Sequence, residues 1–282
     1  MRLIHTIAVL GGDARQRYLA ELLRESDFTV QTFAVPGLEN TAPSVQQAVR
    51  DADAVCLPTP AVRSGSITGL EALTPAQLLS YLEQTAVVFG GGLGAFKTLL
   101  QKTNTPHEDL LQNPALTLEN AALTAEGALS LALQAMPEAL QNANVLVTGF
   151  GRIGKSLARK LQALGANVTL TTRRPAQFST IAQLSCTPDE TGVYRQPLSQ
   201  YACVFNTVPA PVFSAAQIQA LSPACVYIEL ASSPGGIAPD AKKPAAFLAA
   251  PGLPGKTAPK TAAKLLFRAM LDSSYFSSQE AL

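Results

Sequence analysis

The sequence contains no tryptophan, two histidines and four cysteines among its 282 residues. His5 and His107 are far apart, and the cysteines are scattered without a C-x-x-C pair. They are Cys56, Cys186, Cys203 and Cys225. A zinc site needs several such ligands at close spacing, so we expect no metal. The cysteines are most simply reduced, partly buried apolar residues of an intracellular protein.

Charged residues are also few, at 15% with a net charge of +1, whereas hydrophobic residues make up 47%. This balance argues against a nucleic-acid binder, which needs a basic surface. The apolar run at 7–10 is too short for a signal peptide, and the alanine- and leucine-rich stretch 121–136 falls short of a membrane span. We therefore expect a compact cytoplasmic protein, long enough for two domains that each bury a core.

The most informative stretch is the pattern G-x-G-x-x-G at 149–154. An apolar strand is predicted before it, over 144–148, and a helix after it, from about 155 to 164. A second strand is predicted over 166–172. Together these elements form a β-turn-α-β unit typical of dinucleotide-binding domains.

The three glycines have separate predicted roles. Gly149 permits the tight turn, Gly151 leaves room for a pyrophosphate against the backbone, and Gly154 lets the helix pack closely. Arg152 and Ile153 stand at the start of the helix, whose partial positive charge would face the phosphates. The alternative is a glycine-rich turn that binds no ligand.

The end of the second strand indicates the choice of cofactor. Sites that prefer NAD place an Asp or Glu there for the ribose hydroxyls, but this chain has Thr172, followed by Arg173 and Arg174. No carboxylate would repel a 2′-phosphate, and guanidinium groups can pair with it. We therefore predict NADP(H), with Thr172 and Arg173 as contacts. The alternative is that both arginines are solvated loop charges, which applies to Arg174 in particular.

The chain opens with a similar unit, in which Gly11-Gly12 follows a predicted strand at 6–10. This turn is not a dinucleotide fingerprint, because the carboxylate of Asp13 would repel a phosphate. Arg15 offers a forked donor suited to a carboxylate. We predict that Asp13, Arg15 and the turn around Gly12 meet a substrate. Alternatively, Asp13 only caps the following helix, and both roles can hold at once.

Helices are predicted near 44–50, 75–83, 124–139 and 258–272, alternating with strands. The prolines and polar residues of 104–119 predict a connection. The alternation predicts an α/β fold with two Rossmann-like, doubly wound parallel-sheet domains and a cleft between them.

The expected domains are residues 1–122, which would bind the substrate, and residues 123–257, which would bind NADP. The C-terminal helix within 258–282 would pack back on the first domain.

A polar turn follows the strand predicted near 202, where nicotinamide and its ribose are usually held. Its residues are Asn206, Thr207, Val208 and Pro209. Thr124 and Glu126 would point into or near the cleft if the helix predicted from 124 spans the two domains. Alternatively, Glu126 is a first-turn acid that the helix dipole favours.

Three stretches together resemble the A subunit of bacterial dipicolinate synthase. They are Gly-Gly-Asp-Ala-Arg at 11–15, Thr-Ala-Glu-Gly at 124–127 and Ala-Pro-Gly-Leu-Pro-Gly-x-x-Ala-Pro-Lys-Thr-Ala at 250–262. The turns at 206–209 and 230–236 fit the nicotinamide domain of the same family. The resemblance follows the chain in order over nearly its whole length.

The resemblance implies an NADP-dependent oxidoreductase that oxidises dihydrodipicolinate, derived from a lysine-pathway intermediate, to dipicolinate. The product would be made in the mother cell of a sporulating bacterium. A flavoprotein-like B subunit is the expected partner, and we also expect a homo-oligomer.

The resemblance also implies site residues. Ala231 and Ser232 would contact the cofactor, and Gly255 and Thr257 would shape one wall of the substrate cleft. Hydride removal must be accompanied by loss of a proton, which requires a nearby base. Glu126 is the first candidate for that base and Asp13 the second.

Two rival functions remain. One is another dehydrogenase of the same architecture, acting on an amino acid or hydroxy acid. Such enzymes use a His or Lys at the reacting carbon, and neither His5 nor His107 lies in an obvious cleft. The other is a non-catalytic NADP-binding subunit of a flavoprotein complex.

Overall fold

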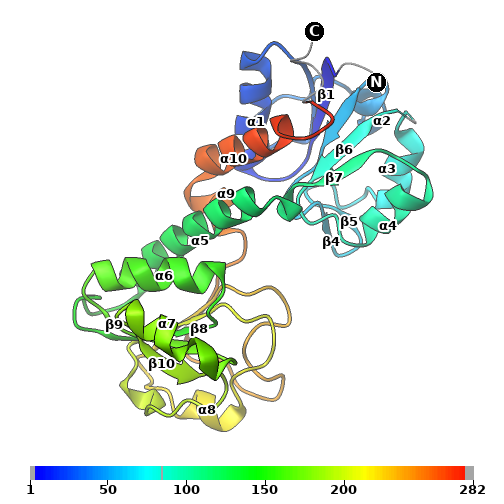
Figure 1. Cartoon of the computed structure of the whole chain (residues 1–282). Coiled ribbons are helices and arrows are strands. Elements are labelled where there is room, and N and C mark those ends of the chain that lie inside the picture. The colour runs from blue at the N-terminus through cyan, green and yellow to red at the C-terminus, as the bar shows by residue number, and fades with distance from the viewer. Residues whose placement is uncertain (1–3, 84, 277–282) are drawn as a thin grey trace. The chain divides into compact units, whose positions relative to one another are not determined.

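The computed structural model describes residues 4–83 and 85–276. Residues 277–282 of the expected C-terminal segment lie outside the described residues. The chain divides into two compact units (Figure 1). Unit 2 is Ala121–Thr257, and unit 1 holds the described residues on either side of it. Within the described ranges, no helix combines the length and the apolar character that crossing a membrane requires.

Unit 1 contains a parallel five-stranded sheet in the order β2-β1-β3-β6-β7. Its strands are β1 (Thr6–Leu10), β2 (Thr29–Phe33), β3 (Ala54–Cys56), β6 (Val87–Gly90) and β7 (His107–Asp109), with a separate hairpin of β4 (Val62–Arg63) and β5 (Ser66–Ile67). Its helices are α1 (Ala14–Glu25), α2 (Val45–Val49), α3 (Pro75–Tyr81), α4 (Ala95–Lys102), the short η1 (Leu110–Gln112) and α10 (Pro259–Leu271), while α5 (Pro114–Ala135) contains the boundary with unit 2.

The sheet of unit 1 is buried on both faces, as a parallel sheet requires. Ala8, Leu10 and Val55 belong to a core that α2, α3 and α4 complete. On the other face, the sulfur of Cys56 lies 3.7 Å from that of Met270 in α10. Helices α1 and α10 pack together over this face (Figure 1).

Unit 2 contains a parallel six-stranded sheet in the order β10-β9-β8-β11-β12-β13. Its strands are β8 (Asn144–Thr148), β9 (Asn167–Thr172), β10 (Thr187–Glu190), β11 (Cys203–Asn206), β12 (Val226–Glu229) and β13 (Ala246–Ala249). Its helices are α6 (Arg152–Ala163), η2 (Pro175–Gln177), α7 (Phe178–Gln183), η3 (Leu198–Gln200), α8 (Ala215–Gln219) and α9 (Leu253–Thr257).

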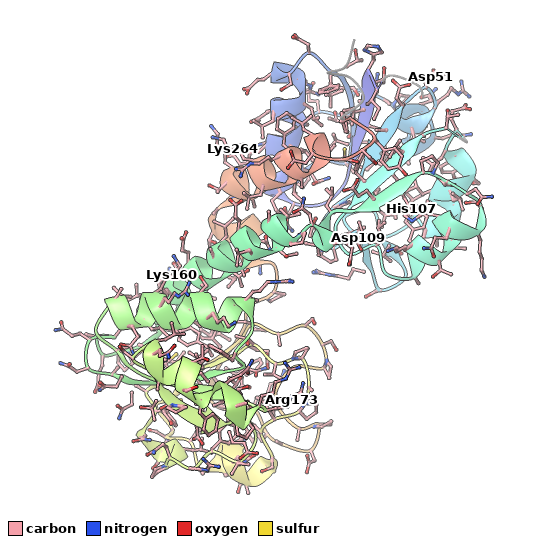
Figure 2. The ribbon with its side chains drawn as sticks, in the orientation of Figure 1. Asp51, His107, Asp109, Lys160, Arg173 and Lys264 are labelled. Atoms are coloured by element: carbon pink, nitrogen blue, oxygen red, sulfur yellow. The ribbon has the colours of Figure 1, made fainter. Side chains whose placement is uncertain are left out.

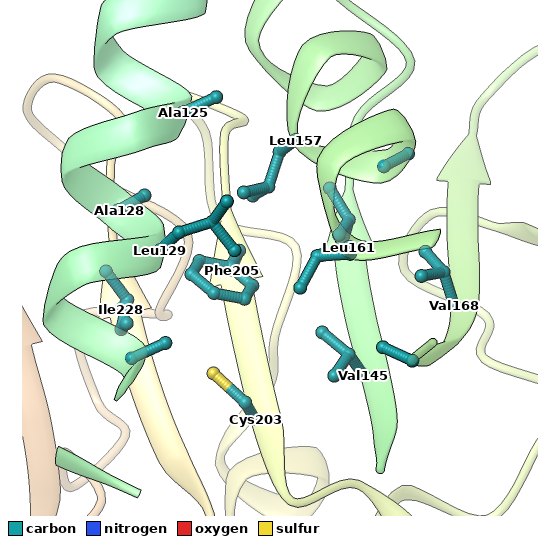
Figure 3. Close-up of a cluster of buried hydrophobic side chains, with 14 of the residues drawn as sticks. Ala125, Ala128, Leu129, Val145, Leu157, Leu161, Val168, Cys203, Phe205 and Ile228 are labelled. Atoms are coloured by element: carbon teal, nitrogen blue, oxygen red, sulfur yellow. The ribbon is translucent and has the colours of Figure 1, made fainter. Parts of the chain in front are cut away.

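Alternate residues of the central strands feed two separate cores. In β8, Val145 and Val147 face α5 and α6, whereas Leu146 faces the layer that contains α8. Phe205 of β11 fills the first core between α5 and α6 (Figure 3). This alternation follows from the period of two in a strand. It confirms the doubly wound, Rossmann-like α/β architecture for unit 2.

The prediction that 104–119 is a connection is wrong, because it contains β7, η1 and the first turn of α5. β7 lacks the apolar alternation of a buried strand, since it is a short edge strand whose side chains are polar. Asp109 (Figure 2) accepts hydrogen bonds from the amides of Gly92 at 2.7 Å and Leu93 at 3.1 Å. Pro114 is the first residue of α5, where proline is compatible with a helix, and Asn113 caps that helix.

The structure predicts that α10 is part of the core of unit 1. Leu266 of α10 is 5% exposed and Leu271 is 38% exposed. We expect Leu266→Ala to lower the free energy of unfolding by about 2–5 kcal/mol through a cavity. Leu271→Ala, the matched control, should change it by about 0.5 kcal/mol or less. Urea unfolding followed by circular dichroism measures both, and equal effects would contradict the docking of α10.

Candidate nucleotide-binding site

The turn after β8 shows what each glycine is needed for. Gly149 has a φ of +94°, a backbone conformation that residues with a side chain rarely adopt. A Cβ there would also lie 2.7 Å from Thr207 Oγ1 and 2.9 Å from Val208 Cγ2. A Cβ on Gly154 would overlap the carbonyl oxygen of Gly149. A Cβ on Gly151 would meet nothing within 4 Å. The packing of the chain therefore requires the first and third glycines, whereas Gly151 leaves open space for a ligand.

This turn forms one wall of a pocket of about 360 Å³ within unit 2. The predicted cofactor residues that line it are Gly149, Gly151, Thr172, Arg173, Thr207, Val208 and Pro209. Phe150, Arg174, Gln177 and Thr191 line it as well. Figure 2 labels Arg173, which follows β9. Four segments that are distant in the sequence, following β8, β9, β10 and β11, thus meet at the carboxyl end of the sheet, where open α/β sheets bind ligands.

The wall beyond β9 is the part of the pocket lined by Thr172, Arg173, Arg174 and Gln177. The directions of its hydrogen bonds decide which groups it offers a ligand. The hydroxyl of Thr172 accepts from the amide of Arg174 at 3.1 Å and donates to Gln177 Oε1 at 2.7 Å. Because a hydroxyl has one proton, Thr172 has none left for a ligand. The amide oxygen of Gln177 accepts this hydrogen bond, so its NH₂ group is the donor that Gln177 can offer to a ligand. With Arg173 and Arg174, this wall is rich in donors and suits an anion.

Thr191 is tied to the glycine turn through Thr171. The amide of Gly149 donates to Thr171 Oγ1 at 3.3 Å, and Thr171 Oγ1 lies 2.6 Å from Thr191 Oγ1. The loop after β10 is therefore held next to the turn after β8.

Asn206 acts inside the protein, since its side chain is 0% exposed and satisfied by the chain. It accepts from Thr148 Oγ1 at 2.5 Å and from the amide of Val208 at 3.2 Å. It donates to the carbonyl of Val208 at 3.0 Å and to Glu229 Oε1 at 2.6 Å. The hydroxyl of Thr207 donates to the carbonyl of Thr148 at 2.7 Å. The turn therefore faces the pocket with its backbone and with Val208 and Pro209.

Glu229 was not predicted from the sequence, although it ends an apolar strand, where an acid is unusual. Besides Asn206, it accepts from the amides of Ala231 at 3.1 Å and Gly236 at 2.8 Å. Ala231 and Ser232 lie in the turn that Glu229 holds, outside the lining of the pocket. Glu229 thus holds the turn that follows β12 at the carboxyl end of the sheet.

Arg152 and Ile153 are the first two residues of α6. Arg152 is exposed, and Ile153 packs against the core of unit 2. Neither side chain lines the pocket, so both contribute through their place at the helix N-terminus beside Gly151.

The predicted base Glu126 forms an ion pair with Lys160 of α6 (Figure 2), at 3.0 Å, and its side chain is 55% exposed. Thr124, two residues earlier in α5, is buried. Gly127 allows α9 to approach, since a Cβ there would lie 2.9 Å from Leu253 Cβ and from Thr257 Oγ1.

Gly255 and Thr257 lie in the short helix α9. The hydroxyl of Thr257 donates to the carbonyl of Leu253 at 2.9 Å, and Gly255 is buried.

In unit 1, the chain itself covers the turn after β1. The amides of Gly11 and Gly12 donate to the carbonyls of Phe33 at 2.9 Å and Thr68 at 3.0 Å. A Cβ on Gly69 would overlap the amide nitrogen of Gly12. The backbone at 68–69 therefore fills the position that phosphates take at a dinucleotide turn.

Asp13 and Arg15 form a forked pair at this turn. Arg15 Nε donates to Asp13 Oδ1 at 2.9 Å, and Nη2 donates to Oδ2 at 2.7 Å and to the carbonyl of Thr59 at 2.5 Å. Asp13 also caps α1, as predicted, by accepting from the amide of Arg15. Burial by itself raises the pKa of Asp13, but the hydrogen bonds and charge of Arg15, with the charge of Arg63, outweigh it and lower the pKa.

The fold and the pocket define a class, the nicotinamide-nucleotide-dependent dehydrogenases. Residues 117–231 match the family described as D-isomer specific 2-hydroxyacid dehydrogenase, NAD binding domain. This match covers the glycine turn and the donor-rich wall, and it supports an oxidoreductase with a nicotinamide cofactor. In the described ranges, no three His, Cys, Asp or Glu side chains are grouped as a metal ion would require.

Residues 6–110 match the family described as the N-terminal domain of the dipicolinate synthase A subunit. The chain is 27% identical to the A subunit of dipicolinate synthase from Bacillus subtilis (strain 168), with 92% of each chain covered. Its sequence is 28% identical to that of the dipicolinate synthase A subunit from Bacillus halodurans. The crystal structure of that subunit matches this structure with a TM-score of 0.84 over 95% of this chain and 97% of the other. The resemblance expected from the motifs is therefore confirmed, and this chain is a relative of the dipicolinate synthase A subunits.

The glycine turn gives a prediction that separates folding from binding. Gly151→Ala should leave the thermal unfolding temperature unchanged but weaken dinucleotide binding about tenfold or more, because a methyl group would stand where the pyrophosphate approaches. Gly149→Ala, in contrast, should cost about 1–3 kcal/mol of stability through its positive φ. Calorimetric titration with NADPH and thermal unfolding measure the two effects. Normal binding by Gly151→Ala would show that the pyrophosphate lies elsewhere.

The lowered pKa of Asp13 predicts a pH dependence of stability. A carboxylate with a depressed pKa in the folded state stabilises the protein above its unfolded pKa, near 3.8, and this contribution is lost as the pH falls through the folded pKa. Asp13→Asn keeps a capping side chain but removes the charge. We expect it to be less stable than the parent at neutral pH, with the difference closing below about pH 3.8.

Urea unfolding across this pH range measures the effect, with the exposed Asp51→Asn as the control. A stability difference that stays constant with pH would mean that Arg15 does not stabilise the charge of Asp13.

Proposed function

We propose that this chain is an NADP-dependent oxidoreductase that converts dihydrodipicolinate to dipicolinate as the A subunit of a dipicolinate synthase. The observation that carries the proposal is the donor-rich pocket beside Gly151, in a chain whose relatives are named as A subunits of dipicolinate synthase. Residues 1–122 would bind the substrate, with the C-terminal helix completing that part, and residues 123–257 would bind NADP.

The preference for NADP rests on the wall beyond β9. A 2′-phosphate carries about two negative charges at neutral pH and several acceptor oxygens. Arg173, Arg174 and the NH₂ group of Gln177 offer donors to it, and no carboxylate stands among the lining residues. Thr172 supports this arrangement indirectly, because its proton holds Gln177 in place. An Asp or Glu at the position of Thr172 would instead favour the two ribose hydroxyls of NAD.

The reaction removes one hydride and one proton from a ring carbon pair of dihydrodipicolinate. NADP⁺ supplies the acceptor for the hydride when it is bound, and a protein base takes the proton. The ring becomes aromatic, and this gain favours the loss of hydride, so the proposal requires no metal.

Glu126 is the proposed base, and its exposed carboxylate is accessible to a ligand. Asp13 is the second candidate. Its lowered pKa makes it a weak proton acceptor, which favours Glu126. Asp13 instead orients Arg15, whose guanidinium is the proposed partner of one substrate carboxylate.

The remaining proposed substrate residues give shape to the site. A Cβ on Gly12 would lie 2.5 Å from Gln16 Cγ and 3.0 Å from Pro58 Cγ, so the packing of the chain requires a glycine there, and Gly12 would shape the substrate site through its backbone. Thr124 on α5 and Gly255 and Thr257 on α9 are the further residues proposed to contact the substrate.

The setting of the reaction is part of the proposal. The names of the relatives describe one component of a multi-subunit synthase, which supports a second component, and we propose a flavoprotein-like B subunit in that role. We also propose a homo-oligomer that works in the cytoplasm of the mother cell during sporulation, on a branch of the lysine pathway.

Two alternatives carry over from the sequence. The chain could act on an amino acid or hydroxy acid, which the match of residues 117–231 to a 2-hydroxyacid dehydrogenase family leaves open. It could also bind NADP without catalysis while a partner does the chemistry.

The first prediction concerns Arg173, the proposed contact of the 2′-phosphate. Arg173→Asp should weaken NADPH binding about tenfold to a hundredfold, because it replaces a charged hydrogen bond with repulsion, and it should leave NADH binding unchanged or stronger. Calorimetric titration with both nucleotides measures this. Arg195→Asp is the matched control, since Arg195 pairs with Glu190 outside the lining of the pocket. If the parent binds NADH at least as well as NADPH, the proposed NADP preference is wrong.

The second prediction concerns the base. In the complex with the B subunit, Glu126→Gln should lower turnover about a hundredfold or more while NADPH affinity stays within about twofold. Glu119→Gln is the control, because Glu119 is also an exposed, ion-paired acid on α5. Full turnover by Glu126→Gln would exclude Glu126 as the base and leave Asp13 as the remaining candidate.

A further inference from the structure

Three polar side chains lie next to one another across neighbouring strands at the carboxyl end of the unit 2 sheet. In the register of the sheet, Asn206 of β11 is paired with Thr148 of β8 on one side and with Glu229 of β12 on the other. The side chains are joined by hydrogen bonds of 2.5 Å and 2.6 Å. They therefore form a continuous polar link beneath the turns that follow β11 and β12.

The donors and acceptors of this link are fully assigned. Both amide hydrogens of Asn206 are used, one by Val208 and one by Glu229, and its oxygen accepts from Thr148 and Val208. Glu229 accepts three N–H groups, from Asn206, Ala231 and Gly236. The two oxygens of the carboxyl group accept all three, whereas a glutamine at this position would face at least one donor with another donor.

The link ends at the pocket. Asn206 holds both the amide and the carbonyl of Val208, and the side chain of Val208 stands 2.9 Å from where a Cβ of Gly149 would be. The position of Val208 relative to the glycine turn therefore depends on the orientation of Asn206, which Glu229 fixes.

We propose that Glu229 is a positioning residue for the nicotinamide end of the nucleotide, acting through Asn206 on the turn Thr207–Pro209. This inference rests on the proposed function, because it assumes that a nicotinamide nucleotide occupies the pocket. The adenosine end is read by different residues, on the loops after β9 and β10, and does not depend on the link. A substitution at Glu229 should therefore weaken the binding of the nicotinamide half of the nucleotide and leave the binding of the adenosine half unchanged.

The test compares a whole nucleotide with its adenosine half, by calorimetric titration with NADPH and with adenosine 2′,5′-bisphosphate. Glu229→Gln should weaken NADPH binding about tenfold or more and change bisphosphate binding less than about twofold. Glu138→Gln, which replaces an exposed glutamate of the same unit, should change neither. If Glu229 only stabilises the fold, Glu229→Gln should weaken the binding of both ligands together.

A second variant reaches the same link with Glu229 intact. A Cβ on Gly236 would press on the side chain of Asn206, and the φ of Gly236 lies outside the left-handed region. Gly236→Ala should reproduce the selective loss of NADPH binding, so the inference can be tested even if Glu229→Gln does not fold.

The outcomes separate the inference from the proposed function. If the parent binds neither ligand, the proposed function fails and the inference fails with it. If the parent binds NADPH more tightly than the bisphosphate, and the folded variants keep this difference, the proposed function stands and the role of Glu229 is refuted.

Discussion

The backbone at Gly149 is the constraint on which the nucleotide site depends. Its positive φ turns the chain sharply after β8, its carbonyl lies where a side chain at 154 would be, and the turn of Thr207 and Val208 closes over it. Two of the three glycines are thus needed before any ligand arrives. Gly151 differs, because a Cβ there would meet nothing within 4 Å, so the packing of the chain does not require a glycine at this position.

Hydrogen-bond direction gives the pocket its chemical character. Thr172 and Asn206 both follow predicted strands and both were expected to contact the cofactor, yet each uses its polar groups within the protein. Thr172 orients Gln177, and Asn206 orients Val208. The residues that they orient, Gln177 and Val208, line the pocket. The wall formed after β9 is rich in donors, because Gln177 lies beside Arg173 and Arg174.

Much of the architecture could be predicted from the sequence, because apolar runs, glycine turns and helical periodicity are local signals. The β-turn-α-β unit around the glycine pattern and the capping role of Asp13 are of this kind. β7 could not be predicted, since a short polar edge strand has no local pattern of its own. Gln177, Thr191 and Glu229 were missed because their roles depend on strand register, which places Glu229 opposite Asn206 and brings the end of β10 beside that of β9.

The most direct test of the central claim is the stoichiometry of the reaction catalysed by the chain with its B subunit. Dihydrodipicolinate and NADP⁺ would be supplied together, and dipicolinate and NADPH would be measured in the same sample. The account predicts that one NADPH forms for each dipicolinate, because the hydride lost on aromatisation has a single acceptor. Dipicolinate formed without NADPH would contradict it, since the nucleotide pocket would then have no part in the chemistry.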